Sequence, residues 1–162
     1  MNNLTSDLFK LGEVIKELSR IYPEIIFGGS LSLKVNNLID REIGDLDIFT
    51  DILPAERALI SFSDSKETSL FSSDFLGCEL KREALVFKGV KICFFEVPIF
   101  MLRDPSIFEM DDGTHIKIQN PLFAITAKMQ YAADSVSITH KEKLKAYKKH
   151  IQDLQTIRNK IS

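Results

Sequence analysis

The stretch FGGSLSLKVNNLIDREIGDLDIF, residues 27–49, brings a glycine pair close in sequence to two alternating aspartates. The residues after the glycines predict a helix of about two turns that starts at Ser30. The run GDLDIFTD then alternates polar and apolar residues, which is typical of a half-buried strand. Because side chains two apart on a strand share a face, Asp45 and Asp47 are expected to point the same way, about 6.6 Å apart along the chain.

This order of residues indicates phosphate and metal chemistry. Two carboxylates on one face repel each other unless a cation neutralises them, and Mg²⁺ suits one or two carboxylates together with phosphate oxygens. Gly28 and Gly29 have no side chains, so a phosphate can approach their backbone closely, and the helix that follows favours an anion. The combination suits transfer of a nucleotidyl group from a nucleoside triphosphate. The alternative is an ordinary glycine turn followed by a strand whose aspartates face solvent.

The bulk composition predicts one soluble, cytoplasmic domain over residues 1–162. The formal net charge of −2 provides no basic field for coating nucleic acid. Cys78 and Cys93 are too few for a disulfide framework or a zinc cluster. The charged N-terminus is unlike a signal peptide, and the apolar runs fall short of the roughly 18 residues that a membrane span needs, so no membrane partner is expected.

Hydrophobic periodicity predicts an α+β fold. The expected sheet is mixed and mainly antiparallel, with about four to five strands, and helices flank it. A core over about 1–118 precedes two C-terminal helices over about 119–162. The expected helices cover 6–23, 30–37, 54–63, 120–134 and 139–160; the expected strands cover 24–29, 44–51, 78–87, 90–100 and 114–118; and a polar loop is expected over 63–74.

The pattern GGSLSL…R…DLDIF resembles the signature of the nucleotidyltransferase (DNA polymerase β-like) superfamily. It most resembles the AbiEii-type branch, which includes toxin components of toxin–antitoxin and phage-abortive systems. GVKICFFEVPIF is similar to that branch's central strand, PLFAITAKMQYAAD to its lysine-bearing helix and KKHIQDLQTI to its closing lysine–aspartate helix. The resemblance implies a Mg²⁺-dependent enzyme that moves a nucleotide to a hydroxyl of RNA, protein or a small molecule. It also implies an antitoxin protein as partner.

The resemblance also implies roles for individual residues. Gly28, Gly29 and Ser30 would hold the triphosphate, Asp45 and Asp47 the metal, Lys128 would meet phosphate, and Asp153 would complete the pocket from the last helix. Arg41, on an expected loop, is either a phosphate contact or a surface arginine. A lysine in the apolar stretch FAITAKMQYAA must snorkel or find an anion. An acid on a helix face explains Asp153 almost as well.

The chain departs from the family pattern on the central strand. The superfamily usually has a third carboxylate there, which helps to activate the attacking hydroxyl, but in VKICFFEV that position falls on Cys93. Glu96 is the nearest acid, and its odd offset places it on the opposite face of a regular strand. Either a bulge re-aims Glu96 into the catalytic site, or the third carboxylate is absent. In the second case the chain is a catalytically degenerate relative that acts as a binding or regulatory module.

The remaining charged residues give weaker signals. The basic run KEKLKAYKKH, residues 141–150, either docks an RNA acceptor or forms a solvated helix face, and the second interpretation is favoured. His115, His140 and His150 show no metal-ligand spacing, so the sequence assigns them no role.

Overall fold

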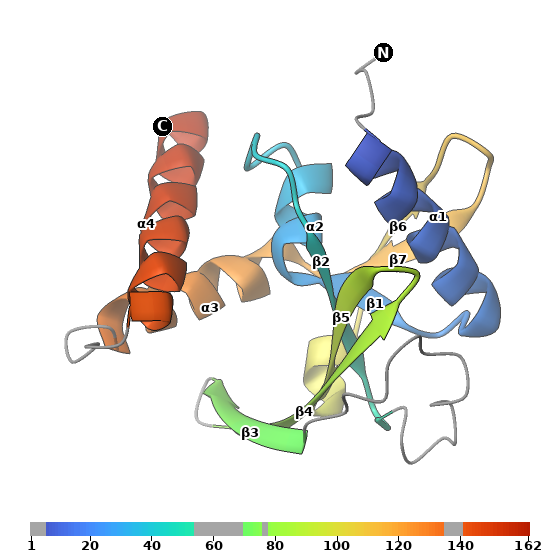
Figure 1. The fold of residues 1–162 in the computed structure, drawn as a ribbon, viewed down its shortest axis with the longest axis horizontal. Helices are drawn as coiled ribbons and strands as arrows, with labels where there is room; N and C mark the ends of the chain where they lie inside the picture. The colour runs from blue at the N-terminus through green and yellow to red at the C-terminus, as the bar shows by residue number, and fades with distance from the viewer. Residues whose placement is uncertain (1–5, 54–69, 76–77, 135–140) are drawn as a thin grey trace.

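The computed structural model describes residues 6–53, 70–75, 78–134 and 141–162. Helices and strands are interspersed along the chain, and two helices close it (Figure 1). The fold is α+β, as the sequence predicts. In chain order the elements are α1 (Ser6–Ile21), β1 (Ile26–Gly28), α2 (Gly29–Val35), β2 (Asp45–Thr50), β3 (Leu70–Phe75), β4 (Cys78–Phe87), β5 (Val90–Glu96), the 3-10 helix η2 (Ile99–Leu102), β6 (Ser106–Glu109), β7 (His115–Ile118), α3 (Pro121–Asp134) and α4 (Lys141–Ile161).

The strands form one mixed sheet in the order β3-β4-β5-β2-β1-β7-β6. Strand β2 runs parallel to β5, and β1 runs parallel to β7. The other neighbours are antiparallel, so the predicted mixed and mainly antiparallel sheet is confirmed. The described residues form seven strands, more than the predicted four to five. The edge strands β3 and β6 were not predicted, because their sequences lack the alternation of apolar and polar residues that indicates a strand. The predicted polar loop over 63–74 is wrong for the part that forms β3, while residues 63–69 and the predicted helix from Pro54 lie outside the described residues.

Two tight turns follow from local sequence. The β4–β5 hairpin turns at Lys88 and Gly89, which both have positive φ, 50° and 75°. A two-residue turn with positive φ at both positions has a backbone twist that matches the twist of the two flanking strands. The turn between β6 and β7 contains Gly113 at φ 84°. Both hairpins therefore lie where the dipeptides KG and DG predict a reversal of the chain.

The two faces of the sheet have different surroundings. On one face, Leu46 and Ile48 of β2 are fully buried and pack with apolar side chains of α1 in the main core. The alternate residues, Asp45, Asp47 and Phe49, project from the other face. A second, smaller apolar cluster covers part of that face and includes Phe49 together with side chains of η2 and α3. The aspartates thus lie on the face opposite α1, on the side of α3.

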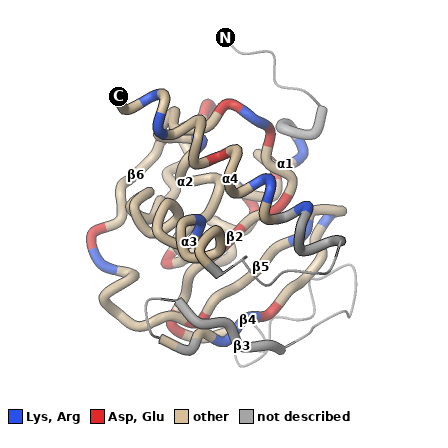
Figure 2. The backbone as a smooth tube through the Cα atoms, turned by 90° about the vertical axis from the view of Figure 1, so that its left-hand side faces the viewer, with Lys and Arg blue, Asp and Glu red and all other residues tan. Residues whose placement is uncertain are grey.

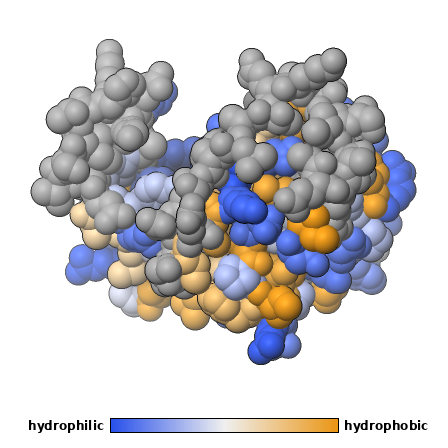
Figure 3. Space-filling view, turned by 90° about the horizontal axis from the view of Figure 1, so that it is seen from below, coloured by the Kyte–Doolittle hydropathy of each residue, from blue (hydrophilic) through white to orange (hydrophobic). Residues whose placement is uncertain are grey.

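The C-terminal helices complete this second face. Helix α3 packs against α2, β1 and α4, and Figure 1 shows it extending away from the sheet toward α4. Figure 2, seen from the side of α4, shows basic positions along α4, whereas the basic residue of α3 is Lys128. Apolar side chains gather on the lower face of the molecule (Figure 3). Among the described residues, no helix has the length and apolar character needed to cross a membrane.

Candidate functional site

The glycine pair and the aspartates lie side by side, as the sequence predicts. Strands β1 and β2 pair so that Gly28 is opposite Asp47. Gly29 has φ +56°, and a Cβ atom there would lie 2.1 Å from the Asp47 Oδ2 atom. A Cβ atom on Gly28 would lie 2.2 Å from Cε2 of Phe49. Both positions therefore require glycine, because any side chain would collide with β2.

The two aspartates of β2 form a pair of like charges on this face. Asp45 is exposed and Asp47 is half-buried. Burial raises the pKa of Asp47 to about 6, and the negative charge of Asp45 adds to the rise. A divalent cation bound between the two carboxylates would relieve this repulsion and favour the ionised form of both. The pair fits Mg²⁺, which binds proteins through one or two carboxylates and completes its coordination with phosphate and water oxygens.

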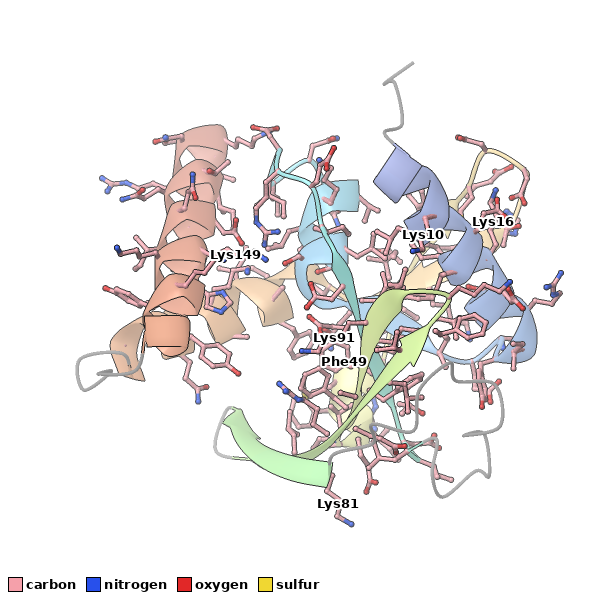
Figure 4. All side chains as sticks on the ribbon, in the orientation of Figure 1. Lys10, Lys16, Phe49, Lys81, Lys91 and Lys149 are labelled. Atoms are coloured by element: carbon pink, nitrogen blue, oxygen red, sulfur yellow. The ribbon has the colours of Figure 1, made fainter. Side chains whose placement is uncertain are left out.

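Basic side chains from three elements act on the aspartate pair. Lys128 of α3, Arg82 of β4 and Lys91 of β5 each oppose the rise in the pKa of Asp47 through their positive charge. Lys91 is the register partner of Asp45, and Figure 4 shows it projecting on the side of the sheet that faces α3 and α4. Cations grouped around one face attract an anionic ligand such as a triphosphate.

The neighbouring strand places a thiol next to the aspartate pair. The parallel β2–β5 register places Cys93 beside Asp47 and Glu96 beside Thr50. This register is continuous from Lys91 to Glu96, so no bulge re-aims Glu96, and its odd offset puts it on the face opposite the aspartates. The interpretation of Glu96 as the third carboxylate is therefore corrected. Burial and the charge of Asp47 raise the pKa of the Cys93 thiol, which keeps it protonated.

Asp153 of α4 joins three elements through one buried carboxylate. The Nε and Nη2 atoms of Arg41 donate to its two oxygens at 2.7 Å each, and Lys128 Nζ lies 2.8 Å from Oδ2. Arg41 Nη2 also donates to Ser30 Oγ at 2.9 Å. Burial alone would raise the pKa of Asp153, but the hydrogen bonds from Arg41 and Lys128 outweigh it and the pKa is lowered. Of the two alternatives for Lys128, snorkelling or pairing with an anion, the structure shows the second: the anion is Asp153, and Arg41 binds the same carboxylate.

Two residues of this region were not identified from the sequence. His150 Nδ1 lies 3.2 Å from Lys128 Nζ, and the His150 ring stacks on Tyr131 with centroids 5.0 Å apart and planes 15° apart. Burial and the charge of Lys128 lower the pKa of His150 to about 4, so the ring is neutral at pH 7. A neutral ring whose Nδ1 accepts from the ammonium carries its proton on Nε2.

The lysines of α4 mostly face solvent. Lys145, Lys148 and Lys149 are exposed, and Lys149 is marked on α4 in Figure 4. This exposure agrees with the favoured interpretation of residues 141–150 as a solvated helix face. The side chains of Lys141 and Lys143 lie outside the described part of the chain.

The comparisons with known proteins add no family assignment. No protein-family model matches the sequence, and no curated protein matches it either. In the described ranges, no group of three or more His, Cys, Asp or Glu side chains could hold a metal ion. The site therefore consists of two carboxylates on β2, the adjacent glycines and the cations around them.

Replacing Asp153 with Asn is expected to destabilise the protein by about 3–5 kcal/mol, since it leaves the buried charge of Lys128 without its anion. Lys128 is only 5% exposed, which is why the loss is large. Urea unfolding at pH 7 measures the change. Asp40→Asn is the matched control: Asp40 pairs with Lys160 at 2.6 Å but its side chain is 77% exposed, so its removal should cost less than about 1 kcal/mol. Equal costs for the two variants would contradict the structural role of Asp153.

Replacing Asp47 with Asn is expected to stabilise the metal-free protein above about pH 6 and to change little below about pH 4. The folded-state pKa of Asp47 is about 6, above its ordinary value of 3.8. Stability therefore falls as the pH rises through this window, because the unfolded chain releases the proton more readily. Urea unfolding from pH 4 to 8 with a chelator measures the difference. Asp111→Asn, at an exposed turn position, should stay within about 0.5 kcal/mol throughout. A destabilised Asp47→Asn variant at pH 8 would contradict the raised pKa of Asp47.

Proposed function

We propose that this chain is a Mg²⁺-dependent nucleotidyltransferase that moves a nucleotide from a nucleoside triphosphate to a hydroxyl acceptor on RNA, protein or a small molecule. The observation that best supports this function is the contact between Gly29 and Asp47. A glycine with positive φ lies against a carboxylate that forms a like-charge pair with Asp45. A phosphate against the glycine backbone and a metal ion on the two aspartates would then be immediate neighbours.

The residues present fit the metal that this reaction uses. Asp45 and Asp47 would hold Mg²⁺, and when bound the ion supplies positive charge that stabilises the attacking and leaving oxygens. Lys128, positioned by its ion pair with Asp153, would direct its charge to the phosphates. Lys91 would add charge from β5. Ser30 would contact the triphosphate, with Arg41 fixing its hydroxyl.

Arg41 and Asp153 support the site as positioning residues. Their bidentate ion pair connects the loop before β2 with α4, while Ser30 connects that loop with α2. Removing either partner would loosen the groups that face the triphosphate. By resemblance to the AbiEii-type branch, the proposal extends to a cytoplasmic toxin that a partner antitoxin protein neutralises.

A second candidate function is nucleotide binding without transfer. The observation that favours it is Cys93, which lies beside Asp47 where the superfamily usually has a carboxylate that activates the acceptor hydroxyl. A protonated thiol cannot accept that hydroxyl's proton. The chain would then bind a triphosphate as a regulatory module.

ATP, GTP, CTP or UTP with Mg²⁺ is expected to raise the melting temperature, because a ligand that binds only the folded state stabilises it, by about 2.7 kcal/mol at a hundred times Kd. The Asp45→Asn, Asp47→Asn double variant should lose the Mg²⁺-dependent part of this shift. The Asp111→Asn, Asp112→Asn double variant, in the β6–β7 turn, should keep it. A wild-type protein that responds to none of the four triphosphates would contradict both candidate functions.

Transfer of a nucleotide labelled at the α-phosphate separates the two candidates. An active enzyme labels RNA, protein or a small acceptor, and Glu96→Gln should leave that activity intact because Glu96 lies on the other face of the sheet. Triphosphate binding without transfer, together with activity gained in Cys93→Asp, would favour the binding module. A third carboxylate is tolerated there only when metal neutralises the first two.

A further inference from the structure

Four side chains form a ladder across the contact between α3 and α4. Lys128 and Tyr131 are three residues apart on α3, and His150 and Asp153 are three residues apart on α4. Side chains with this spacing share one face of a helix. Lys128 pairs with Asp153 at 2.8 Å and meets His150 at 3.2 Å, and His150 in turn stacks on Tyr131. The ladder therefore runs from the buried ion pair outward to an aromatic ring.

The outer end of this ladder is an exposed aromatic surface. Tyr131 is 53% exposed although one side of its ring is held by the His150 stack. Helix packing alone would favour burying the ring, because a large aromatic side chain contributes most when it is removed from water. A ring that stacks on one neighbour and is otherwise exposed offers aromatic surface on which a ligand can stack.

The position of this ring relative to the charged groups suggests its ligand. His150 connects Tyr131 with the Lys128 ammonium. Its ring stacks on Tyr131 with centroids 5.0 Å apart, and its Nδ1 atom lies 3.2 Å from Lys128 Nζ. Lys128 in turn acts electrostatically on Asp47. A nucleotide has two parts, its phosphates and its base. The cationic and metal-binding groups match the phosphates, and the aromatic surface of Tyr131 matches the base.

We infer that Tyr131, supported by His150, is the surface on which a nucleobase stacks, either the base of the triphosphate or a base of a nucleic-acid acceptor. The inference rests on the proposed function and adds a subsite to it. Stacking on an aromatic face tolerates every base, because each base has a π-face. The subsite would therefore bind purine and pyrimidine nucleotides with only modest differences in affinity.

The absence of tryptophan from the chain makes the inference directly measurable. Tyr131→Trp introduces one indole at the proposed subsite. ATP with Mg²⁺ should quench its fluorescence, whereas inorganic tripolyphosphate with Mg²⁺, which has no base, should not. Phe108→Trp is the matched control, since Phe108 is 40% exposed on the edge strand β6; ATP should leave its fluorescence unchanged. A single-stranded oligonucleotide is the third ligand, and quenching by it alone would assign the base to the acceptor.

Affinity measurements provide the second readout. Tyr131→Ala should weaken ATP binding by about 5- to 150-fold, the range expected for one lost base–aromatic stack. Its affinity for tripolyphosphate should match the wild type, and Tyr131→Phe should bind ATP as the wild type does. A melting temperature measured without ligand checks that each variant is folded.

The outcomes separate this inference from the proposed function. If wild type binds ATP but neither ATP nor the oligonucleotide quenches Tyr131→Trp, the stacking subsite is wrong and the proposed function stands. If Tyr131→Ala weakens ATP and tripolyphosphate equally, Tyr131 acts on the phosphates or on the helix contact, which also overturns the inference. If wild type binds no triphosphate, the proposed function fails, and quenching by the oligonucleotide alone decides whether Tyr131 receives a base.

Discussion

The arrangement of the candidate site depends on the carboxylate of Asp153. It lies between Arg41 and Lys128, is almost completely buried, and accepts hydrogen bonds from both cations. Through Arg41 it also fixes Ser30. Helices α2, α3 and α4 and the loop before β2 are thereby held around one charge. A buried ion cluster of this kind contributes little net stability compared with an apolar one, and its value lies in fixing geometry.

The two aspartates of β2 are in the opposite electrostatic situation, because each lies close to a like charge. Asp153 has two close cationic partners, whereas burial, together with the negative charge of Asp45, raises the pKa of Asp47 to about 6. Two carboxylates in that state destabilise the folded chain, and such local costs are characteristic of sites that bind a ligand. Gly28 and Gly29 bring the backbone close to β2. No larger residue could replace either glycine, because a Cβ atom would collide with a side chain of β2. Both features are explained if a metal ion and a phosphate complete the site.

Local patterns predicted much of this arrangement, and long-range pairing accounts for what they missed. The glycine turn, the parity of Asp45 and Asp47 and the KG hairpin follow from period and turn chemistry alone. Strands β3 and β6 do not, because β3 is Ser-rich and every residue of β6 is exposed; both form by pairing along β4 and β7. Strand parity placed Glu96 on the face opposite the aspartates, but only the β2–β5 register showed that Cys93 adjoins Asp47. The role of His150 depended on how α3 and α4 pack, which the spacing within each helix does not specify.

The most direct test of the central claim is a crystal structure of the protein with a non-hydrolysable nucleoside triphosphate and Mn²⁺ in place of Mg²⁺. Anomalous scattering locates the manganese independently of the protein atoms. We expect an ion bound by carboxylate oxygens of both Asp45 and Asp47 and by phosphate oxygens, at about 2.0–2.2 Å, with the phosphates against Gly28 and Gly29. A triphosphate bound on another face of the molecule, or manganese that contacts neither aspartate, would contradict it.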